Sequence, residues 1–235
     1  MTQVAIIQSC YIPWKGYFDI INDVDIFIFL DDTQYTVRDW RNRNRIKMPT
    51  GESKWLSLPV LGGRNQLICE ALIDNSQSWR KTHLTTLNHS YGKSSYFELY
   101  FPALEKIYGE PNLHLSELNR KLTSQISEWL GINTKFFNSV DLRVGGHKDD
   151  KLIGLVKAVG GCGYVSGPAA RAYIVAEKFS AENISLRFHN YSGYPEYPQI
   201  SDPFDHFVSV LDLLFMIGPD AREYIWGARR MKLND

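Results

Sequence analysis

The sequence predicts an α/β fold with a mainly parallel sheet of βαβ units, Rossmann-like, and a helical middle segment. Short apolar runs rich in β-branched residues alternate with segments whose apolar residues recur at helical spacing. The first three such segments are "VAIIQS", "YIPWKGYFDIINDV" and "DIFIFLDD". They are typical of a strand, a helix and a strand within about 30 residues, the length of one βαβ unit. The third is apolar nearly throughout, as expected of a strand covered on both faces.

The same patterns place the later elements. Strands are expected at residues 54–60, 66–74, 134–140, 163–167 and 184–191. Helices are expected at residues 76–92, 94–109, 113–131, 148–161, 168–183 and 207–218, with a short one at 219–225. Because no repeat or linker interrupts the alternation, we expect a single domain over residues 1–235. It can be subdivided into an N-terminal α/β part (1–92), a helical segment (93–130) and a C-terminal α/β part (131–235).

The composition limits the classes of function. The 26 basic and 26 acidic side chains cancel, whereas a general nucleic-acid-binding protein normally has a basic excess. No apolar stretch approaches the roughly 20 residues that span a bilayer, and the first residues do not resemble a signal peptide. The three cysteines are too widely spaced to indicate a disulfide framework or a zinc site. These features predict a cytoplasmic protein that does not bind nucleic acid or insert into a membrane.

Three segments are expected to meet at one edge of the sheet. In a parallel α/β sheet, ligands bind beyond the carboxyl ends of the strands. "QSCYIPW", "DDTQYTVRDW" and "SGPAAR" each follow a predicted strand there. In the second segment, Asp31 and Asp32 could orient a nucleophile, take a proton from an amine or hold a metal ion. Acids at a strand end also cap turns, so this structural role stays open.

A ladder of basic side chains follows these two acids, made up of Arg38, Arg41, Arg43, Arg45 and Lys47. If residues 41–47 are extended, alternation puts the last four on one face. Four cations in a row repel one another unless an anion or acids lie opposite. A diphosphate would suit them, because guanidinium groups bind phosphate oxygens two at a time. The alternative is an exposed ribbon on which they pair with Asp31, Asp32 and Asp39.

Two further positions could contribute to chemistry at this edge. Ser166 and Gly167 precede a predicted helix with Arg171 one turn in, which is the geometry of an anion site. A plain tight turn is equally consistent with this stretch. Cys10 lies in the first strand-to-helix loop, where a helix N-terminus would lower the thiol pKa and favour a nucleophilic thiolate. A lone cysteine is more often a small apolar core residue.

His83, on the predicted helix 76–92, is the histidine best suited to act as a base. Buried histidines more often have a structural hydrogen-bonding role, and this alternative also stays open. The cysteines, histidines and acids show no metal-ligand spacing, so no metal site is expected.

The chain resembles the WbqC-like protein family. The resemblance rests on the continuous stretch "QSCYIPWKGYFDIINDVDIFIFLDDTQYTVRDWRNRNRIK" and continues through "WLSLPV", "WRKTH", "YVSGPAARAYI", "YPEYPQ" and "SVLDLLF". It implies a bacterial protein of O-antigen or other surface-polysaccharide synthesis. Family members often have Pro and Asn, or a similar pair, where this chain has Ser9 and Cys10. The resemblance therefore does not require a thiol nucleophile.

The resemblance and the residues together give a first hypothesis, N-acyl or aminoacyl transfer to the amine of a nucleotide-diphosphate amino sugar. The co-substrate would be an acyl thioester of coenzyme A or of an acyl or peptidyl carrier protein, and no tightly bound cofactor is expected. The expected catalytic residues are Asp32, His83, Asp31 and Cys10. The expected substrate-binding residues are Gln8, Tyr11, Trp14, Tyr35, Arg38, Trp40, Arg41, Arg43, Arg45, Ser166, Gly167 and Arg171.

Two alternatives stay open. In a Mg²⁺-dependent nucleotidyl or phosphoryl transferase, Asp31 and Asp32 would hold the metal and the arginines would hold a triphosphate. In a non-catalytic partner of a polysaccharide assembly complex, the charged stretch would be an interface.

Overall fold

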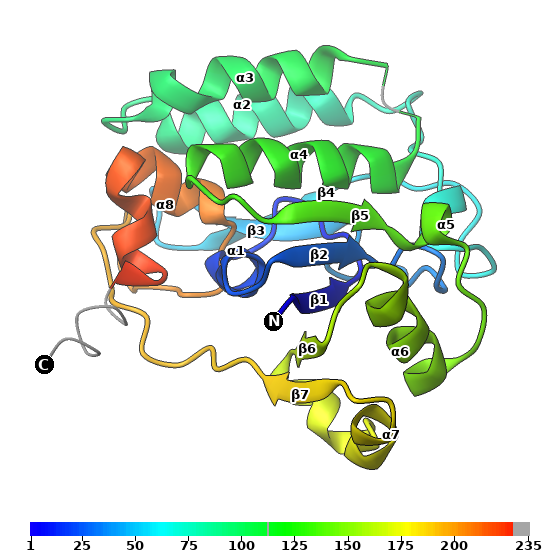
Figure 1. Cartoon of the computed structure of the whole chain (residues 1–235). Helices are drawn as coiled ribbons and strands as arrows, with labels where there is room; N and C mark the ends of the chain where they lie inside the picture. Colours follow the sequence, from blue (N-terminus) through cyan, green and yellow to red (C-terminus); the bar gives the residue numbers. More distant parts are fainter. Residues whose placement is uncertain (112, 228–235) are drawn as a thin grey trace, which may run out of the picture.

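A five-stranded parallel sheet forms the centre of the protein. The computed structural model describes residues 1–111 and 113–227. The sheet has the order β5-β2-β1-β6-β7 (Figure 1), and its strands are β1 (Gln3–Ile7), β2 (Ile26–Phe29), β5 (Lys135–Asn138), β6 (Gly163–Ser166) and β7 (Ser185–Phe188). All four neighbouring pairs are parallel. The strand order reverses between β1 and β6, which is the switch point where doubly wound folds bind ligands. The predicted fold class is confirmed.

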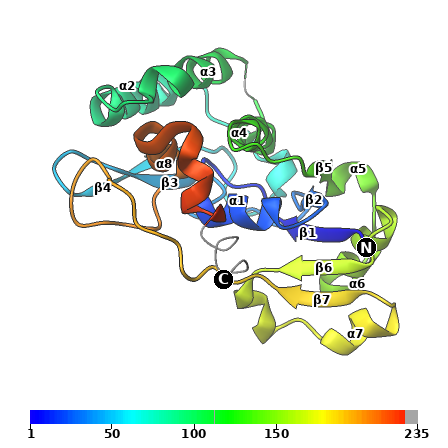
Figure 2. The same cartoon turned by 60° about the vertical axis from the view of Figure 1, so that its left-hand side comes forward.

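Helices cover both faces of the sheet. Alternate strand residues point to opposite faces, so Ala5 and Phe27 enter one buried cluster while Val4 and Ile28 enter another. In Figures 1 and 2, α2, α3 and α4 lie on the β5 side of the sheet, and α6 and α7 lie near β6 and β7. The helices are α1 (Lys15–Asn22), α2 (Trp79–Tyr91), α3 (Phe97–Gly109), α4 (Leu115–Trp129), α5 (Ser139–Leu142), α6 (Lys148–Ala158), α7 (Ala176–Ala181) and α8 (Val210–Ile217).

A separate antiparallel hairpin carries most of the basic ladder. It consists of β3 (Arg43–Lys47) and β4 (Ser53–Ser57). Ile46 and Leu56 are fully buried or nearly so and join the larger core cluster. Arg43 and Arg45 alternate with these buried positions and lie on the other face. The backbone is extended over residues 43–47, so the condition for alternating side chains is met there.

Two expected elements are wrong. Residues 66–74 do not form a strand, because Leu67, Leu72 and Ile73 each make one isolated bridge to a different partner, and no ladder can grow. The expected helix at 168–183 is divided where the Val175 N–H donates to Asp149 Oδ2 from an extended backbone. A short 3-10 helix, η1 (Ile68–Glu70), lies within the first of these segments, and another, η2 (Pro168–Ala172), begins the second. A third 3-10 helix, η3 (Gly218–Tyr224), follows α8.

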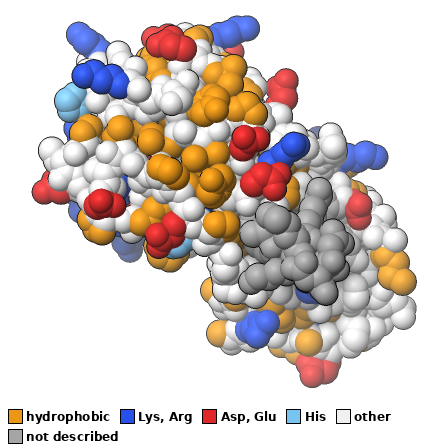
Figure 3. Space-filling model, turned by 90° about the vertical axis from the view of Figure 1, so that its left-hand side faces the viewer, with side chains coloured by type: hydrophobic (Ala, Val, Ile, Leu, Met, Phe, Trp, Pro, Cys, Tyr) orange, Lys and Arg blue, Asp and Glu red, His pale blue; other side chains and the backbone are white. Residues whose placement is uncertain are grey.

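A long strap, residues 189–208, connects β7 to α8 without a named helix or strand. Its first residue, His189, is buried between Asp19 and Asp23, with ring nitrogens 2.9 and 2.8 Å from their carboxylates. On the face shown in Figure 3, hydrophobic side chains lie among charged ones. Such a mixture is usual for a protein surface and by itself indicates no binding site.

Candidate functional site

Two adjoining cavities lie beyond the carboxyl ends of β1 and β6, where the strand order reverses. The larger, here the switch-point cavity, has a volume of about 700 Å³ and a wall that includes Gln8, Thr33, Arg41, Lys148, Lys151, Ser166, Gly167 and Tyr173. The smaller, here the aromatic cavity, has a volume of about 460 Å³ and a wall that includes Cys10, Trp14, Tyr17, Trp40, Arg41, Tyr191 and Phe207. All three segments expected at this edge contribute, so the predicted convergence is confirmed.

Another hollow, of about 720 Å³, lies at the amino edge of the sheet beside Thr2, Asp25 and Lys135. None of the predicted site residues lines it. The predicted residues that line a cavity are therefore found at the carboxyl edge.

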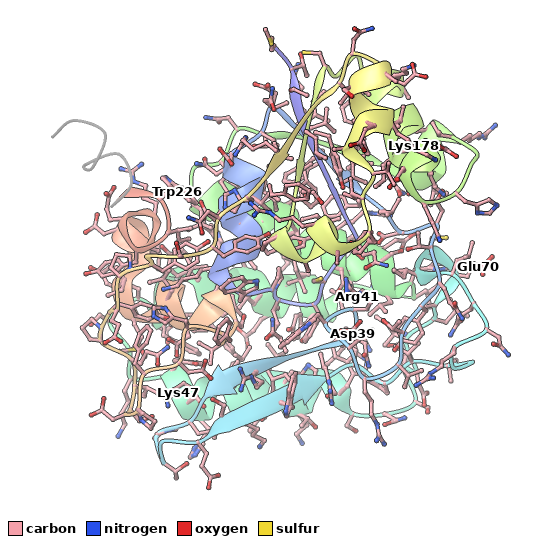
Figure 4. The ribbon with its side chains drawn as sticks, turned by 90° about the horizontal axis from the view of Figure 1, so that it is seen from below. Asp39, Arg41, Lys47, Glu70, Lys178 and Trp226 are labelled. Carbon is pink, nitrogen blue, oxygen red and sulfur yellow. The ribbon has the colours of Figure 1, made fainter. Side chains whose placement is uncertain are left out.

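Arg41 lies at the junction of the two cavities and lines both. Its Nη1 donates to Cys10 Sγ at 3.4 Å and its Nη2 donates to Asp39 Oδ2 at 3.4 Å. Its Nε is buried and has no hydrogen-bond partner among the described residues. Figure 4 shows Arg41 and Asp39 together in the middle of the molecule, while Lys47 lies toward the far end of the hairpin. A guanidinium that keeps donor capacity inside a cavity can bind an oxyanion or a phosphate oxygen.

Cys10 is buried, and its thiol donates to the Gln8 carbonyl oxygen at 3.6 Å. Burial raises the pKa of this thiol, and the nearby Arg41 charge offsets only part of that effect. The expectation of a lowered thiol pKa is therefore wrong. The physical reason is that α1 begins at Lys15 with Trp14 as its cap, so the helix N-terminus lies several residues beyond Cys10. The neutral thiol is a poor nucleophile.

The two predicted acids point in different directions. Asp31 is fully buried, and its Oδ1 accepts the Ser9 N–H at 2.9 Å while its Oδ2 lies 3.7 Å from Arg120. Burial raises the pKa of Asp31 despite these partners. Asp31 lines neither cavity. Its observed role is to hold the loop after β1 in place.

Asp32 does not line the switch-point cavity, but its ion-pair partner does. Its Oδ1 accepts a hydrogen bond from Ser139 Oγ at 2.5 Å, and its Oδ2 forms an ion pair with Lys151, which lines the cavity. Because Asp31 and Asp32 bind partners on different helices, they do not form the paired metal ligands that the nucleotidyl-transferase alternative requires.

The sequence analysis missed Lys148, Lys151, Tyr173, Tyr191 and Phe207 as cavity residues. Lys148 is exposed at the start of α6 and has a left-handed backbone, with φ of 49°. The helix that follows a parallel strand begins at the carboxyl edge of the sheet. The helix expected at 148–161 could therefore have indicated that both lysines lie near the cavity. No local pattern marks Tyr191 and Phe207, because the irregular strap brings them to the site.

The basic ladder does not form one binding row, which corrects the expected diphosphate grip. The Arg43 and Arg45 guanidiniums lie 4.2 and 5.7 Å from the Trp55 ring, and Arg45 also pairs with Asp205 at 3.5 Å. Lys47 is buried and donates to backbone carbonyls of the hairpin turn and the strap. Arg38 is exposed and lines neither cavity. Of the five, Arg41 alone is placed in a described cavity wall.

His83, Tyr11 and Tyr35 lie away from both cavities. His83 Nδ1 is 2.7 Å from the Tyr11 hydroxyl, which also contacts Tyr108, and His83 Nε2 is 3.2 Å from the Ser57 carbonyl oxygen. Burial lowers the pKa of His83 to about 4. The histidine is therefore a neutral, structural hydrogen-bonding residue. Tyr35 is buried, and burial raises its pKa to about 12.

Ser166 and Gly167 line the switch-point cavity, but the long helix expected after them is absent. The short η2 takes its place and cannot supply the macrodipole of a regular α-helix. The Arg171 guanidinium lies 5.0 Å from the Phe188 ring and outside the cavity walls. Ser166 and Gly167 thus keep their expected location, whereas the helix-based anion site is not formed.

Over residues 1–111 and 113–227, no cluster of three histidine, cysteine or acidic side chains is arranged to hold a metal ion. In the same part of the chain, no helix combines the length and apolar character needed to cross a membrane.

Comparisons with known proteins agree with the sequence resemblance. The family model of the WbqC-like protein family matches residues 8–224. A relative, "Uncharacterized protein Rv1507c" of Mycobacterium tuberculosis (strain ATCC 25618 / H37Rv), is 43% identical over 228 residues, covering 96% of this chain and 98% of the relative. No solved structure matches significantly. With most of its length matched by both comparisons, the chain belongs to the WbqC-like protein family.

Proposed function

We propose that the protein is a cytoplasmic transferase that moves an acyl or aminoacyl group from a thioester to the amine of a nucleotide-diphosphate amino sugar in surface-polysaccharide synthesis. The observation that supports this most is the meeting of two unlike cavities at Arg41. A transfer between two substrates needs adjoining sites, and the reacting atoms must meet where those sites join.

The switch-point cavity suits the nucleotide-diphosphate sugar. Arg41, Lys148 and Lys151 place cationic groups around it, and Ser166 adds a hydroxyl. These groups would hold the diphosphate oxygens by charge-assisted hydrogen bonds. Tyr173, 69% exposed on the same wall, offers a ring face on which a nucleobase can stack.

Asp32 is the proposed proton acceptor, because only the neutral amine attacks a thioester. The sugar ammonium gives its proton to the Asp32 carboxylate, and the freed nitrogen lone pair bonds to the thioester carbonyl carbon. The carbon–sulfur bond then breaks and the electron pair leaves with the sulfur. The surplus proton on the nitrogen passes to the departing thiolate, so that a neutral amide and a free thiol result. The Asp32 carboxylate forms an ion pair with Lys151, which lines this cavity. The Arg41 donors would stabilise the negative charge that develops on the carbonyl oxygen.

Purified protein incubated with a panel of nucleotide-linked amino sugars and acyl thioesters tests this proposal. We expect an N-acylated sugar nucleotide by mass spectrometry and one free thiol released per amide formed. If the protein instead forms a new phosphate linkage from a nucleoside triphosphate and Mg²⁺, the acyl-transfer proposal is wrong. Complete inactivity across the panel would support a non-catalytic role.

A further inference from the structure

We infer that the aromatic cavity is the acyl-binding site and that it takes an uncharged, apolar acyl group, with the thioester carbonyl at Arg41. This inference rests on the proposed function and names the chemical class of its second substrate. It gives a role to the aromatic cavity, which the nucleotide-diphosphate sugar does not occupy in the proposed function.

The cavity walls are mainly aromatic rings. The Trp14 ring lies 5.4 Å from the Tyr191 ring and 5.5 Å from the Phe207 ring, measured between centroids. Gly16 has no side chain to displace the Trp14 indole, which lies directly over its backbone. Phe207 and Trp40 are 58% and 42% exposed, so they mark the open end. Cys10 and Arg41 are much less exposed and mark the inner end.

A nucleobase fits this cavity poorly, because two polar side chains in its wall, Asn44 and Tyr17, already have hydrogen-bond partners within the protein. The Asn44 amide is already engaged: Nδ2 donates to the Ile12 carbonyl oxygen at 2.8 Å and Oδ1 accepts the Arg45 N–H at 2.8 Å. The Tyr17 hydroxyl donates to the Gln8 carbonyl oxygen at 3.1 Å. A buried polar edge without hydrogen bonds is costly, whereas an acyl chain needs none.

The position of Arg41 explains why the carbonyl would lie at the inner end. Arg41 is shared by both cavities, as are Ile7, Ala169 and Tyr191. A carbonyl at Arg41 therefore faces the switch-point cavity, from which the sugar amine would attack. The acyl chain then extends away from the sugar toward Trp40 and Phe207. In this arrangement the length of the aromatic cavity sets the preferred acyl length.

A binding experiment separates this inference from the proposed function. Acetamide, butyramide, hexanamide and octanamide imitate acyl groups but cannot react. Isothermal titration should show affinity rising by about fourfold per added CH₂ until the chain fills the cavity. Trp40→Ala and Phe207→Ala should each weaken hexanamide binding by about fivefold or more. Trp55→Ala is the matched control, since Trp55 is 40% exposed beside Trp40 but lines neither cavity.

Uridine monophosphate is the second probe and should bind without displacing hexanamide. Displacement of hexanamide by the nucleotide, or equal effects of Trp40→Ala and Trp55→Ala, would overturn the inference. If the amides bind in the predicted order but no thioester gives acyl transfer, the apolar binding site is supported and the proposed reaction is wrong. Acyl transfer with a chain-length preference unchanged in Phe207→Ala would support the reaction and overturn the inference.

Discussion

The Arg41 guanidinium lies 3.4 Å from the Cys10 sulfur, and this contact closes the inner end of the aromatic cavity. The same guanidinium lines the switch-point cavity. The Arg41 backbone is also held in place, because Asn119 Nδ2 donates to the Arg41 carbonyl oxygen at 2.8 Å. One side chain of the basic ladder thus lines two cavities, whereas its neighbours on the hairpin stack on Trp55.

Arg41→Gln should lower kcat/KM for amide formation by about tenfold to hundredfold, since a charge-assisted hydrogen bond is worth ~1.5–3 kcal/mol. The matched control is Arg43→Gln, which removes the next guanidinium on the same face, outside both cavities. That control should keep kcat/KM within about twofold, because it touches no substrate. Steady-state kinetics of both variants checks this. Equal losses of kcat/KM in the two variants would indicate that the arginines of the ladder bind the substrate together.

Cys10→Ser should keep most of the activity, because direct attack by the amine needs no enzyme nucleophile. Burial raises the thiol pKa above its ordinary value of 9.0, so the neutral thiol predominates at neutral pH. The rate of Cys10 alkylation by iodoacetamide should therefore still be rising at that pH, whereas the rate for an ordinary thiol would be levelling off there. Mass spectrometry after incubation with the thioester alone should show no acyl adduct. A stable adduct at Cys10 with a large rate loss in the serine variant would establish a two-step mechanism.

Asp32→Asn should lower kcat by about a hundredfold or more while the fold is retained, since a general base contributes 10²–10⁴-fold. Asp31→Asn provides the contrast, because the buried Asp31 carboxylate accepts the Ser9 N–H and faces Arg120. Its main effect should be a lower Tm. If Asp31→Asn instead abolished activity at unchanged Tm, the two acids would have exchanged roles.

His83 should affect stability rather than catalysis. Its pKa is lowered from 6.5 to about 4 by burial, so the unfolded chain binds a proton before the folded one. The stability that neutral His83 contributes is present above pH 6.5 and is lost as the pH falls through this window to about 4. The slope is about 1.4 kcal/mol per pH unit for one proton. His83→Gln should reduce the slope of the curve of unfolding free energy against pH by that amount between pH 4 and 6.5, measured by denaturant unfolding at each pH.

Much of the fold could be predicted because the relevant forces are local. Runs such as Ile26–Phe29 are apolar on both faces, and such runs form buried parallel strands. Strand ends then place Gln8, Thr33 and Ser166 at one sheet edge without further information. Residues 66–74 could not be predicted, since their three single bridges depend on segments that tertiary structure brings together.

The candidate site was only partly predictable for a similar reason. Alternation correctly put Arg43 and Arg45 on one hairpin face, but it cannot indicate that Trp55 covers them. The loop position of Cys10 was expected from the sequence, whereas its burial depends on Arg41 and on distant aromatic residues. Tyr191 and Phe207 reach the aromatic cavity through an irregular strap, for which periodicity gives no prediction.

The location of a bound diphosphate tests the account most directly. A crystal structure of the protein with a nucleotide-diphosphate amino sugar should show the diphosphate in the switch-point cavity, with its oxygens bonded to Arg41 and Lys148. The sugar amine should face the junction with the aromatic cavity, and the aromatic cavity should hold no part of the nucleotide. A diphosphate bound instead to Arg43 and Arg45 on the hairpin face, or a nucleobase between Trp14 and Phe207, would contradict the account.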